Sequence, residues 1–366
     1  MNIGLFTDSF EKNDKMYNAI SYLKKGLVEL GHNVYIFSAG TKEQEKTKLK
    51  DVFYFTSAQF KQYPDFKIAV FPFFSTTDIA KKLKLDLIHV VGLGTMGIAG
   101  FKTAEKLKIP KIATISVLMH KMLSIVFANE TFERVMNDLV YKYIKWYYSN
   151  FDHIVTPSAF ADKIMTNDLN IQANSIIPYG IDYKFFSNEM AKRRFKHNFV
   201  TGGNLIKEKN IQHIINSFNS ILNKHNNAKL HIFGSGNYES ELKTLVKTNK
   251  IENNVLFYGN IDKEKLRALF LKTSLYLYSS NIDVQPMSLL ESMAAGVIPI
   301  AIKNSFAEDI LDERFIYKDE FDLPKKISDL LESNLEELRY ELKEIVKDYD
   351  YQLIARRYER VYEKLI

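Results

Sequence analysis

The chain contains no cysteine among its 366 residues. This absence excludes disulfide bonds, zinc thiolate sites and cysteine nucleophiles, and it fits a reducing compartment. No apolar run approaches the ~20 residues that a membrane-spanning helix needs. Met1 leads directly into an apolar strand, so we expect no signal peptide. These absences favour a cytoplasmic protein.

Composition and charge indicate a globular protein of two domains. Hydrophobic residues make up 46% and charged residues 26% of the chain, whose length suits two cores of ordinary size. The net charge of +6 is uneven, since residues 1–200 hold 27 basic and 19 acidic side chains, whereas residues 201–366 hold 23 and 25. A basic first half suits an anionic membrane surface or solubility alone. No nucleic-acid motif accompanies the charge, so we expect no nucleic-acid partner.

Strand and helix patterns alternate along the chain. Residues 2–7 form an apolar strand, 17–29 an amphipathic helix and 34–37 a second strand, and further strands are expected at 68–71, 87–91 and 111–115. This alternation predicts βαβ units on a parallel sheet. A second series of strands and helices begins at Phe199. The fold class is therefore α/β, with two Rossmann-like parallel-sheet domains.

The segment GLGTMG at residues 92–97 matches the G-x-G-x-x-G pattern of dinucleotide-binding turns. An NAD(P)-dependent oxidoreductase is therefore one alternative. However, the segment follows a late strand, and residues 110–120 contain no acidic side chain where one is expected. A tight turn between a strand and a helix is the favoured interpretation.

Residues 279–302 (SSNIDVQPMSLLESMAAGVIPIAI) predict a loop, a short helix ending near Gly296, and a strand. Backbone amides at a helix start bind anions, and the carboxylates of Asp283 and Glu291 can accept hydrogen bonds from sugar hydroxyls. This combination suits a nucleotide-sugar. The spacing from Ser288 to Glu291 is also that of a capping box, which needs no ligand.

The run LLESMAAGVIPIA resembles the acidic-x7-acidic region of retaining GT-B glycosyltransferases, family 4. The segments PYGID at 178–182 and EKN at 208–210 are similar to further motifs of that family. The resemblance implies two Rossmann-like domains facing a cleft. The acceptor domain would span 1–188, with a C-terminal helix at 350–366 packing back on it, and the nucleotide-sugar domain 189–349. We expect the linker near residues 192–196.

The resemblance further implies transfer of a hexose from a nucleotide-sugar to an acceptor hydroxyl, with retention at the anomeric carbon. Asp283 would contact the sugar, Glu291 the ribose, and Lys209 the leaving diphosphate, so Asp283 and Lys209 are the candidate catalytic residues. Ser116 and His120 are candidates on the acceptor side. The candidate donor-binding residues are Gly203, Asn204, Lys209, Gly234, Asp283, Met287, Ser288, Leu289, Leu290 and Glu291.

Four departures from the family pattern lie near the expected donor. Residues 11–16 lack the usual glycine, Ser116 stands for a histidine, Asn204 for an arginine, and Asp283 for a glutamate. Asn204 cannot supply a guanidinium charge. A catalytically degenerate protein acting as a binding or scaffold subunit is therefore the second hypothesis.

We expect neither a metal nor a cofactor, because the Asp348-Tyr349-Asp350 triplet is interpreted as a solvated helix break. The UDP- or GDP-linked sugar is a substrate. The expected acceptor is a glycan, a membrane lipid or a lipid-linked sugar, with peripheral attachment to the inner face of the membrane as one option.

The aromatic helix at 132–149 suits either a belt of aromatic side chains at a membrane interface or ordinary packing within the domain, and ordinary packing is favoured. The sequence names no nucleotide, sugar, acceptor, linkage or oligomeric state.

Overall fold

The computed structural model describes residues 1–11, 16–46, 50–60, 63–69, 72–116, 130–187 and 195–366. The chain forms two compact units, one of Met1–Gly180 with Tyr351–Ile366 and one of Ile181–Asp350. The first unit thus ends eight residues before the boundary expected at 188, because the short helix α8 (Tyr183–Ser187) packs against helices of the second unit. Most of the expected linker, residues 192–194, lies outside the described residues. Among the described residues, no helix is long and apolar enough to span a membrane.

The first unit is built on a sheet of eight strands within its described residues, in the order β4-β3-β2-β1-β5-β6-β7-β8. The strands are β1 (Asn2–Thr7), β2 (Asn33–Gly40), β3 (Val52–Phe60), β4 (Tyr63–Ala69), β5 (Leu87–Val91), β6 (Lys111–Thr114), β7 (His153–Thr156) and β8 (Ser175–Ile176). All neighbouring strands pair in parallel except β3 and β4. The predicted parallel α/β sheet is confirmed, but of the strand expected at 68–71 the described residues 68 and 69 end β4, which pairs antiparallel with β3.

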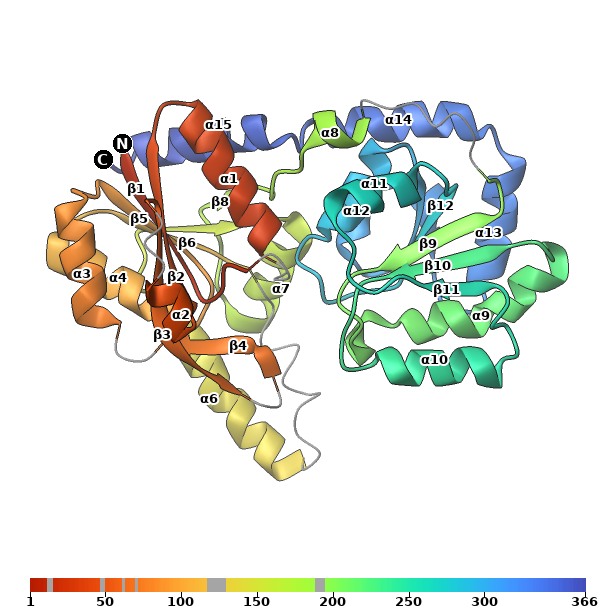
Figure 1. Cartoon of the computed structure of the whole chain (residues 1–366), viewed down its shortest axis with the longest axis horizontal. Coiled ribbons are helices and arrows are strands. Elements are labelled where there is room, and N and C mark those ends of the chain that lie inside the picture. The colour runs from red at the N-terminus through yellow and green to blue at the C-terminus, as the bar shows by residue number, and fades with distance from the viewer. Residues whose placement is uncertain (12–15, 47–49, 61–62, 70–71, 117–129, 188–194) are drawn as a thin grey trace. The chain divides into compact units, whose positions relative to one another are not determined.

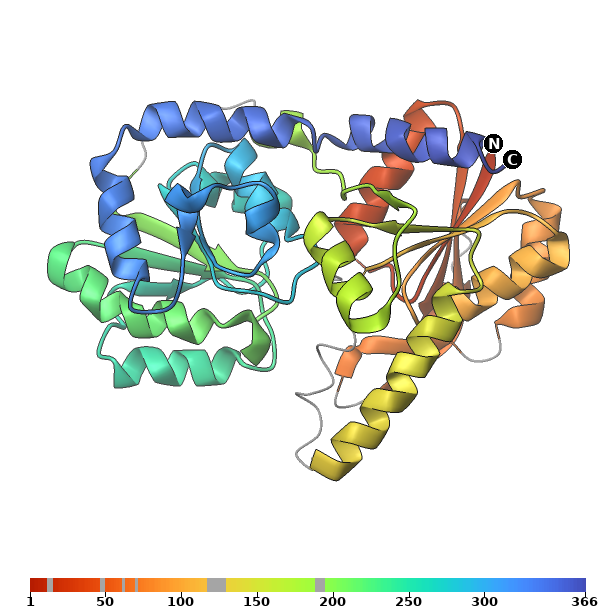
Figure 2. The ribbon, with the colours of Figure 1, turned by 180° about the vertical axis from the view of Figure 1, so that it is seen from behind.

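Helices cover both faces of this sheet, and Figures 1 and 2 show α1 and α15 side by side. One apolar core lies between these two helices and strands β1, β2 and β5. The approach is close: a Cβ on Gly26 of α1 would lie 2.5 Å from the Cβ of Ala355 on α15. The helices of the unit are α1 (Tyr17–Glu29), α2 (Lys42–Lys46), α3 (Phe73–Lys82), α4 (Thr95–Leu107), α6 (Glu130–Tyr148), α7 (Ala159–Leu169) and α15 (Tyr351–Glu363).

A buried polar network fixes α15 to the sheet. The ring nitrogens of His89 on β5 lie 2.7 Å from the Tyr362 hydroxyl and 2.7 Å from the Thr114 hydroxyl, and Tyr358 lies 3.2 Å from Thr114. Burial lowers the pKa of His89 to about 3, so the imidazole is neutral at physiological pH. His89 therefore holds the C-terminal helix in place.

The second unit is built on a parallel sheet of six strands within its described residues, in the order β11-β10-β9-β12-β13-β14. Its strands are β9 (Asn198–Gly202), β10 (Lys229–Phe233), β11 (Val255–Phe257), β12 (Leu275–Tyr278), β13 (Ile298–Ile302) and β14 (Ile316–Tyr317). Its helical segments are α8, η1 (Lys207–Lys209), α9 (Ile211–Lys224), α10 (Glu239–Thr248), α11 (Lys263–Phe270), α12 (Met287–Ala294), η2 (Phe306–Asp309), η3 (Glu313–Phe315), α13 (Leu323–Glu332) and α14 (Leu335–Lys347).

Two layers of helices sandwich this second sheet. Helix α9 packs with α10 and α13, while α12 packs with α14 and α8, as Figure 1 shows on the two sides of the sheet. The chain order switches beside β9, whose neighbours are β10 and β12. In open parallel sheets, ligands bind at the carboxyl ends of the strands at such a switch point. The turns after β9, β10 and β12 are therefore where a site is expected.

Candidate active site

Helix α12 starts at Met287, with Pro286 as its N-cap residue. Ser288 therefore lies inside the helix, and its hydroxyl is 2.9 Å from that of Tyr276 on β12. The capping-box interpretation of Ser288 and Glu291 is wrong, because a cap must precede the helix. Gly296, with φ of 75°, ends the helix as expected. Glu291 is thus available for a role other than capping.

The start of α12 presents a ring of backbone amides. The first four N–H groups of an α-helix have no partner within the helix, and they mark the positive end of its dipole. In α12 the N-cap residue Pro286 has no N–H, so these groups belong to Met287, Ser288 and Leu289, while the amide of Leu290 is the first that can bond back within the helix. The side chains of Leu289 and Leu290 are fully buried, which fixes the helix against the sheet. Such a rigid helix start can bind a phosphate group.

Lys209 and Asp283 form an ion pair just before this helix. The Lys209 ammonium contacts both carboxylate oxygens of Asp283, and the Tyr278 hydroxyl donates a hydrogen bond of 3.1 Å to the same carboxylate. Burial raises the pKa of Asp283, but the charge and hydrogen bond of Lys209, with the hydrogen bonds of Ser280 and Tyr278, outweigh it and hold the pKa below its usual value. The structure thus brings the two candidate catalytic residues together, although 74 positions separate them.

Glu291 is almost fully buried, with 4% of its surface exposed. Burial raises its pKa to about 7, with the Asp182 charge adding to the effect and the Lys263 charge opposing it. Lys263 and Asp182 form an ion pair of 2.8 Å beside it. A buried carboxyl group of raised pKa is typical of functional sites. Sequence reasoning missed Lys263 and Tyr278, since neither lies in a motif that we compared.

Two glycine turns lie next to each other beside this group. The Gly203 amide donates a hydrogen bond of 3.1 Å to the Phe233 carbonyl, and a Cβ on Gly234 would lie 1.8 Å from the Gly203 oxygen. Gly203 and Gly234 have φ of 117° and 97°, which favour glycine. A Cβ on Gly203 would meet no described atom within 4 Å, so that side of the turn is open. Asn204 follows in this turn and is half-buried.

The glycine-rich segment of the first unit has a different role. The Asp8 carboxylate accepts hydrogen bonds from the backbone amides of Gly94, at 2.7 Å, and Met96, at 3.1 Å. A Cβ on Gly92 or Gly94 would lie within 2.6 Å of that carboxylate. The chain's own anion thus occupies the place where a dinucleotide phosphate would bind. This geometry rules out the nicotinamide interpretation of this turn.

The acceptor-side candidates belong to the first unit. Ser116 is half-buried just after β6, at the carboxyl end of the sheet. His120 and most of the expected first loop, residues 12–15, lie outside the described residues. Ser116 is thus at the edge where a ligand of this sheet would bind.

Neither a cluster of metal ligands nor the pocket along α10 coincides with these candidate residues in the part of the chain that the structure describes. No group of three or more metal-ligating side chains occurs among the described residues. Asp350, expected in a solvated break, is instead buried where its backbone pairs with Ile181.

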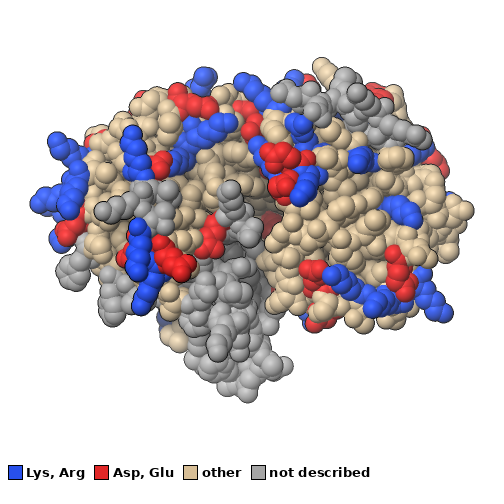
Figure 3. Space-filling view, in the orientation of Figure 1, with Lys and Arg blue, Asp and Glu red and all other residues tan. Residues whose placement is uncertain are grey.

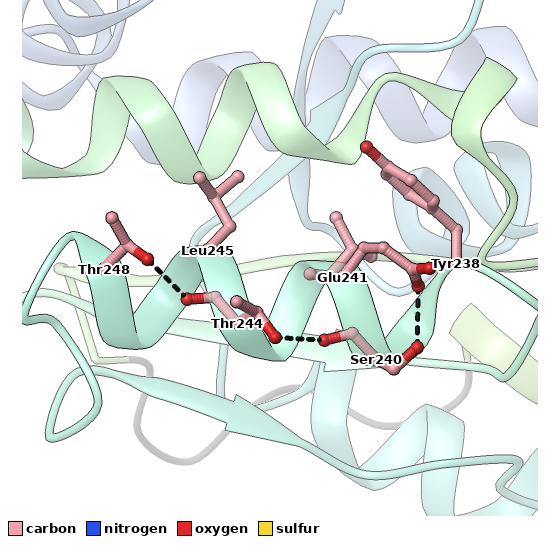
Figure 4. A pocket seen from close by; sticks show the side chains of 7 residues that line it. Tyr238, Ser240, Glu241, Thr244, Leu245 and Thr248 are labelled. Atoms are coloured by element: carbon pink, nitrogen blue, oxygen red, sulfur yellow. Dashed lines mark hydrogen bonds between the residues drawn. The ribbon is translucent and has the colours of Figure 1, made fainter.

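A pocket of about 370 Å³ lies along α10, and none of the candidate residues lines it. Figure 4 shows that its polar groups bond to one another, such as Ser240 to Glu241 at 2.7 Å.

Two family models match the chain. The model described as Glycosyltransferase Family 4 matches residues 18–185, and the model described as Glycosyl transferases group 1 matches residues 184–349. The chain belongs to the GT-B glycosyltransferases. The family resemblance predicted from the sequence motifs is therefore confirmed.

Two curated relatives align with most of this glycosyltransferase, and both are named alpha-monoglucosyldiacylglycerol synthase. The one from Streptococcus pneumoniae is 25% identical over an alignment 366 residues long, gaps included. This alignment covers 93% of this chain and 82% of the relative. The one from Acholeplasma laidlawii is 22% identical over an alignment 351 residues long, which covers 87% of this chain and 86% of the relative.

Solved structures share the fold of this glycosyltransferase. A sucrose-phosphate synthase from Thermosynechococcus elongatus superimposes with a TM-score of 0.77 at 17% identity, covering 100% of this chain and 99% of that protein. HepE from Anabaena in complex with UDP gives a TM-score of 0.77 at 14% identity, with 100% of both chains covered. At such identities the likeness concerns the fold alone.

Proposed function

We propose that this glycosyltransferase moves a hexose from a UDP- or GDP-linked sugar to the hydroxyl of a membrane lipid of the diacylglycerol class, with retention at the anomeric carbon. The observation that carries the donor proposal is the group around the start of α12, where Lys209 and Asp283 precede the helix amides and Glu291 lies one turn further. Retention is proposed from the family resemblance.

The donor would bind to the second unit through charge and hydrogen bonds. The amides of α12 and the Lys209 ammonium would stabilise the leaving diphosphate, and such electrostatic stabilisation is usually the largest contribution to catalysis. Glu291 would accept hydrogen bonds from the ribose, and Asp283 from the hexose. Because Lys209 and the helix start supply the positive charge, we propose a reaction that needs no metal.

The lipid acceptor is proposed from the relatives' names and from one surface of the first unit. Leu139 and Trp146 on α6 are 54% and 47% exposed, and Lys142 and Lys145 are exposed beside them. Apolar and basic side chains together suit the surface of an anionic membrane. The neighbouring residues Tyr147 and Tyr148 are buried, so the expected ordinary packing describes only one side of the helix.

The arrangement of α6 supports this proposal. Figure 2 shows α6 extending beyond the sheet of its unit. In Figure 3 the Lys and Arg side chains of the same unit are dispersed among acidic and uncharged ones on the visible face. Dispersed charge favours weak, salt-sensitive attachment at the surface, which a peripheral enzyme of the inner face of the membrane needs.

A donor panel with vesicles tests the proposed function. The whole chain would be incubated with UDP- and GDP-sugars and with phosphatidylglycerol vesicles that contain diacylglycerol. We expect nucleotide release and a new glycolipid with one donor. Donor binding without any release would favour the scaffold hypothesis, to which Asn204 points. No binding and no release would contradict both hypotheses.

The membrane contact is tested separately with matched charge variants. The double variant Lys142→Gln and Lys145→Gln should bind phosphatidylglycerol vesicles roughly 10-fold or more weakly, since each lysine near an anionic surface contributes about 1 kcal/mol. Lys224→Gln with Lys247→Gln removes the same charge from exposed sites of the second unit. If this control weakened vesicle binding equally, α6 would not be the contact.

A further inference from the structure

Asp283 is held by one charged partner, Lys209, and by two neutral hydroxyl groups, those of Tyr278 and Ser280. The Lys209 ammonium contacts both of its carboxylate oxygens, and the neutral Tyr278 hydroxyl donates to one of them at 3.1 Å. The side chains of Lys209 and Asp283 are only 15% and 20% exposed. The Ser279 hydroxyl also donates a hydrogen bond of 2.7 Å to the Lys209 carbonyl, so the segments that carry the pair are joined.

We propose that Asp283 is an internal counter-ion that Lys209 exchanges for the donor's diphosphate, and that Tyr278 is a positioning residue that keeps Asp283 directed at the hexose during this exchange. This inference rests on the proposed function of the site. It adds a role for Tyr278, a residue outside the sequence motifs, and a step that precedes transfer.

The charges at the site require such an exchange. A diphosphate at the start of α12 would attract Lys209, and the same diphosphate would repel the Asp283 carboxylate. The neighbouring turn supplies no guanidinium, because Asn204 stands where the family has an arginine. Lys209 must therefore turn from one anion to the other when the donor binds.

Tyr278 is suited to hold Asp283 once Lys209 has turned away. Burial and the Asp283 charge raise the pKa of Tyr278 well above its usual value, so its hydroxyl remains a donor. A buried carboxylate that lost every partner would be strongly destabilised. With the Tyr278 and Ser280 hydroxyls retained as donors, Asp283 keeps its position and presents its carboxylate to a sugar hydroxyl.

Nucleotide binding to Asp283→Asn tests the exchange without any turnover. Calorimetry would compare the whole wild-type chain and the variant with UDP, GDP and inorganic pyrophosphate. We expect Asp283→Asn to bind the preferred diphosphate about 10-fold more tightly, because Lys209 no longer has an anionic partner to leave. Without ligand, the variant should melt at a lower temperature, since Lys209 is then buried without a counter-ion.

The outcomes separate this inference from the proposed function. If wild type binds a nucleotide and Asp283→Asn binds it equally or more weakly, the counter-ion exchange is wrong while the donor site stands. If neither protein binds any of the three probes, the donor site and the exchange are both wrong.

A pair of tyrosine variants tests the positioning role. Tyr276 and Tyr278 are both buried on β12, but the Tyr276 hydroxyl contacts Ser288 rather than Asp283. Tyr278→Phe should leave the Kd of UDP within about twofold, because it leaves the charge of Asp283 in place, and should reduce the extra affinity of UDP-hexose over UDP about 10-fold, because Asp283 is then no longer directed at the hexose. Tyr276→Phe should leave that ratio unchanged. Equal effects of both variants on the ratio would show a structural role of β12 and overturn the assignment.

Discussion

Two helix starts of the molecule differ in the charge that the chain itself places beside them. In the first unit, the glycine-rich turn before α4 receives the carboxylate of Asp8, which bonds to its amides at 2.7 and 3.1 Å. In the second unit, the helix start of α12 follows an ion pair of Lys209 and Asp283. The comparison teaches that an anion site depends on which charge the chain itself places there, and not on its glycines.

The largest effect is expected from removing Lys209, the cation beside the start of α12. Lys209→Ala should lower turnover by roughly 10²–10³, the scale observed when a group that stabilises developing charge is lost. Lys207→Ala is the matched control, since its side chain is exposed on the same segment. Steady-state rates with the preferred donor would measure the turnover of both variants. A loss below about threefold for Lys209→Ala would mean that the helix amides stabilise the leaving group alone.

Glu291 provides the next test, because its carboxyl group is buried beyond the helix start. Glu291→Gln should weaken donor binding about 10-fold, since the charged acceptor of the ribose hydrogen bonds is lost. Calorimetry with the donor measures this. Unchanged affinity would remove the ribose assignment.

The same variant should also alter how stability depends on pH. Burial raises the pKa of Glu291 from 4.5 to about 7 in the folded chain. Between these values the folded state binds more protons than the unfolded state, so the free energy of unfolding falls as pH rises from about 4.5 to about 7. Melting temperatures across this window should decline more steeply for wild type than for Glu291→Gln. Parallel profiles of the two proteins would contradict the raised pKa.

Removing the internal anion of the first turn should have a smaller, purely structural effect. Asp8→Ala should lower the free energy of unfolding by about 1 kcal/mol, as loss of a helix cap does. Asp8→Asn keeps a hydrogen-bond acceptor for the backbone amides, so its free energy of unfolding should fall by less than that of Asp8→Ala. Denaturant titration would compare them, and the UDP affinity of both should equal that of wild type. Tight binding of NAD by Asp8→Ala would show that only this carboxylate excludes a dinucleotide.

The sequence predicted the parts of the fold that depend on local pattern. Alternating apolar segments predicted the parallel strands, and Gly296 predicted the end of α12. The sequence did not predict contacts between distant residues: Asp8 and Gly94 are 86 positions apart, and Lys209 and Asp283 are 74 apart. The antiparallel pairing of β3 and β4 was missed because VFYFTSAQF lacks a clear alternation of apolar and polar residues.

The site illustrates the same division between local and distant information. The motif around Glu291 indicated a carboxylate near a helix start, yet its spacing from Ser288 equally suited a cap. Only the position of the first helical residue, Met287, separates these interpretations. Helix boundaries depend on packing as well as propensity, which explains why sequence patterns locate them poorly.

The smallest effect is expected in the turn after β9, where this chain departs from the family pattern. Asn204 is half-buried beside the open side of Gly203, and the family has an arginine at this position. In an active enzyme that works with Lys209 alone, Asn204→Arg should change turnover by no more than about twofold or reduce it, as substitutions away from a required contact do. In a degenerate scaffold, the added guanidinium returns a missing charge and should create donor hydrolysis. Nucleotide release from UDP- and GDP-sugars, measured for both proteins, distinguishes the two hypotheses. A wild type that releases no nucleotide, together with an Asn204→Arg variant that does, would favour the scaffold, because the chemistry would then depend on a charge that this chain lacks.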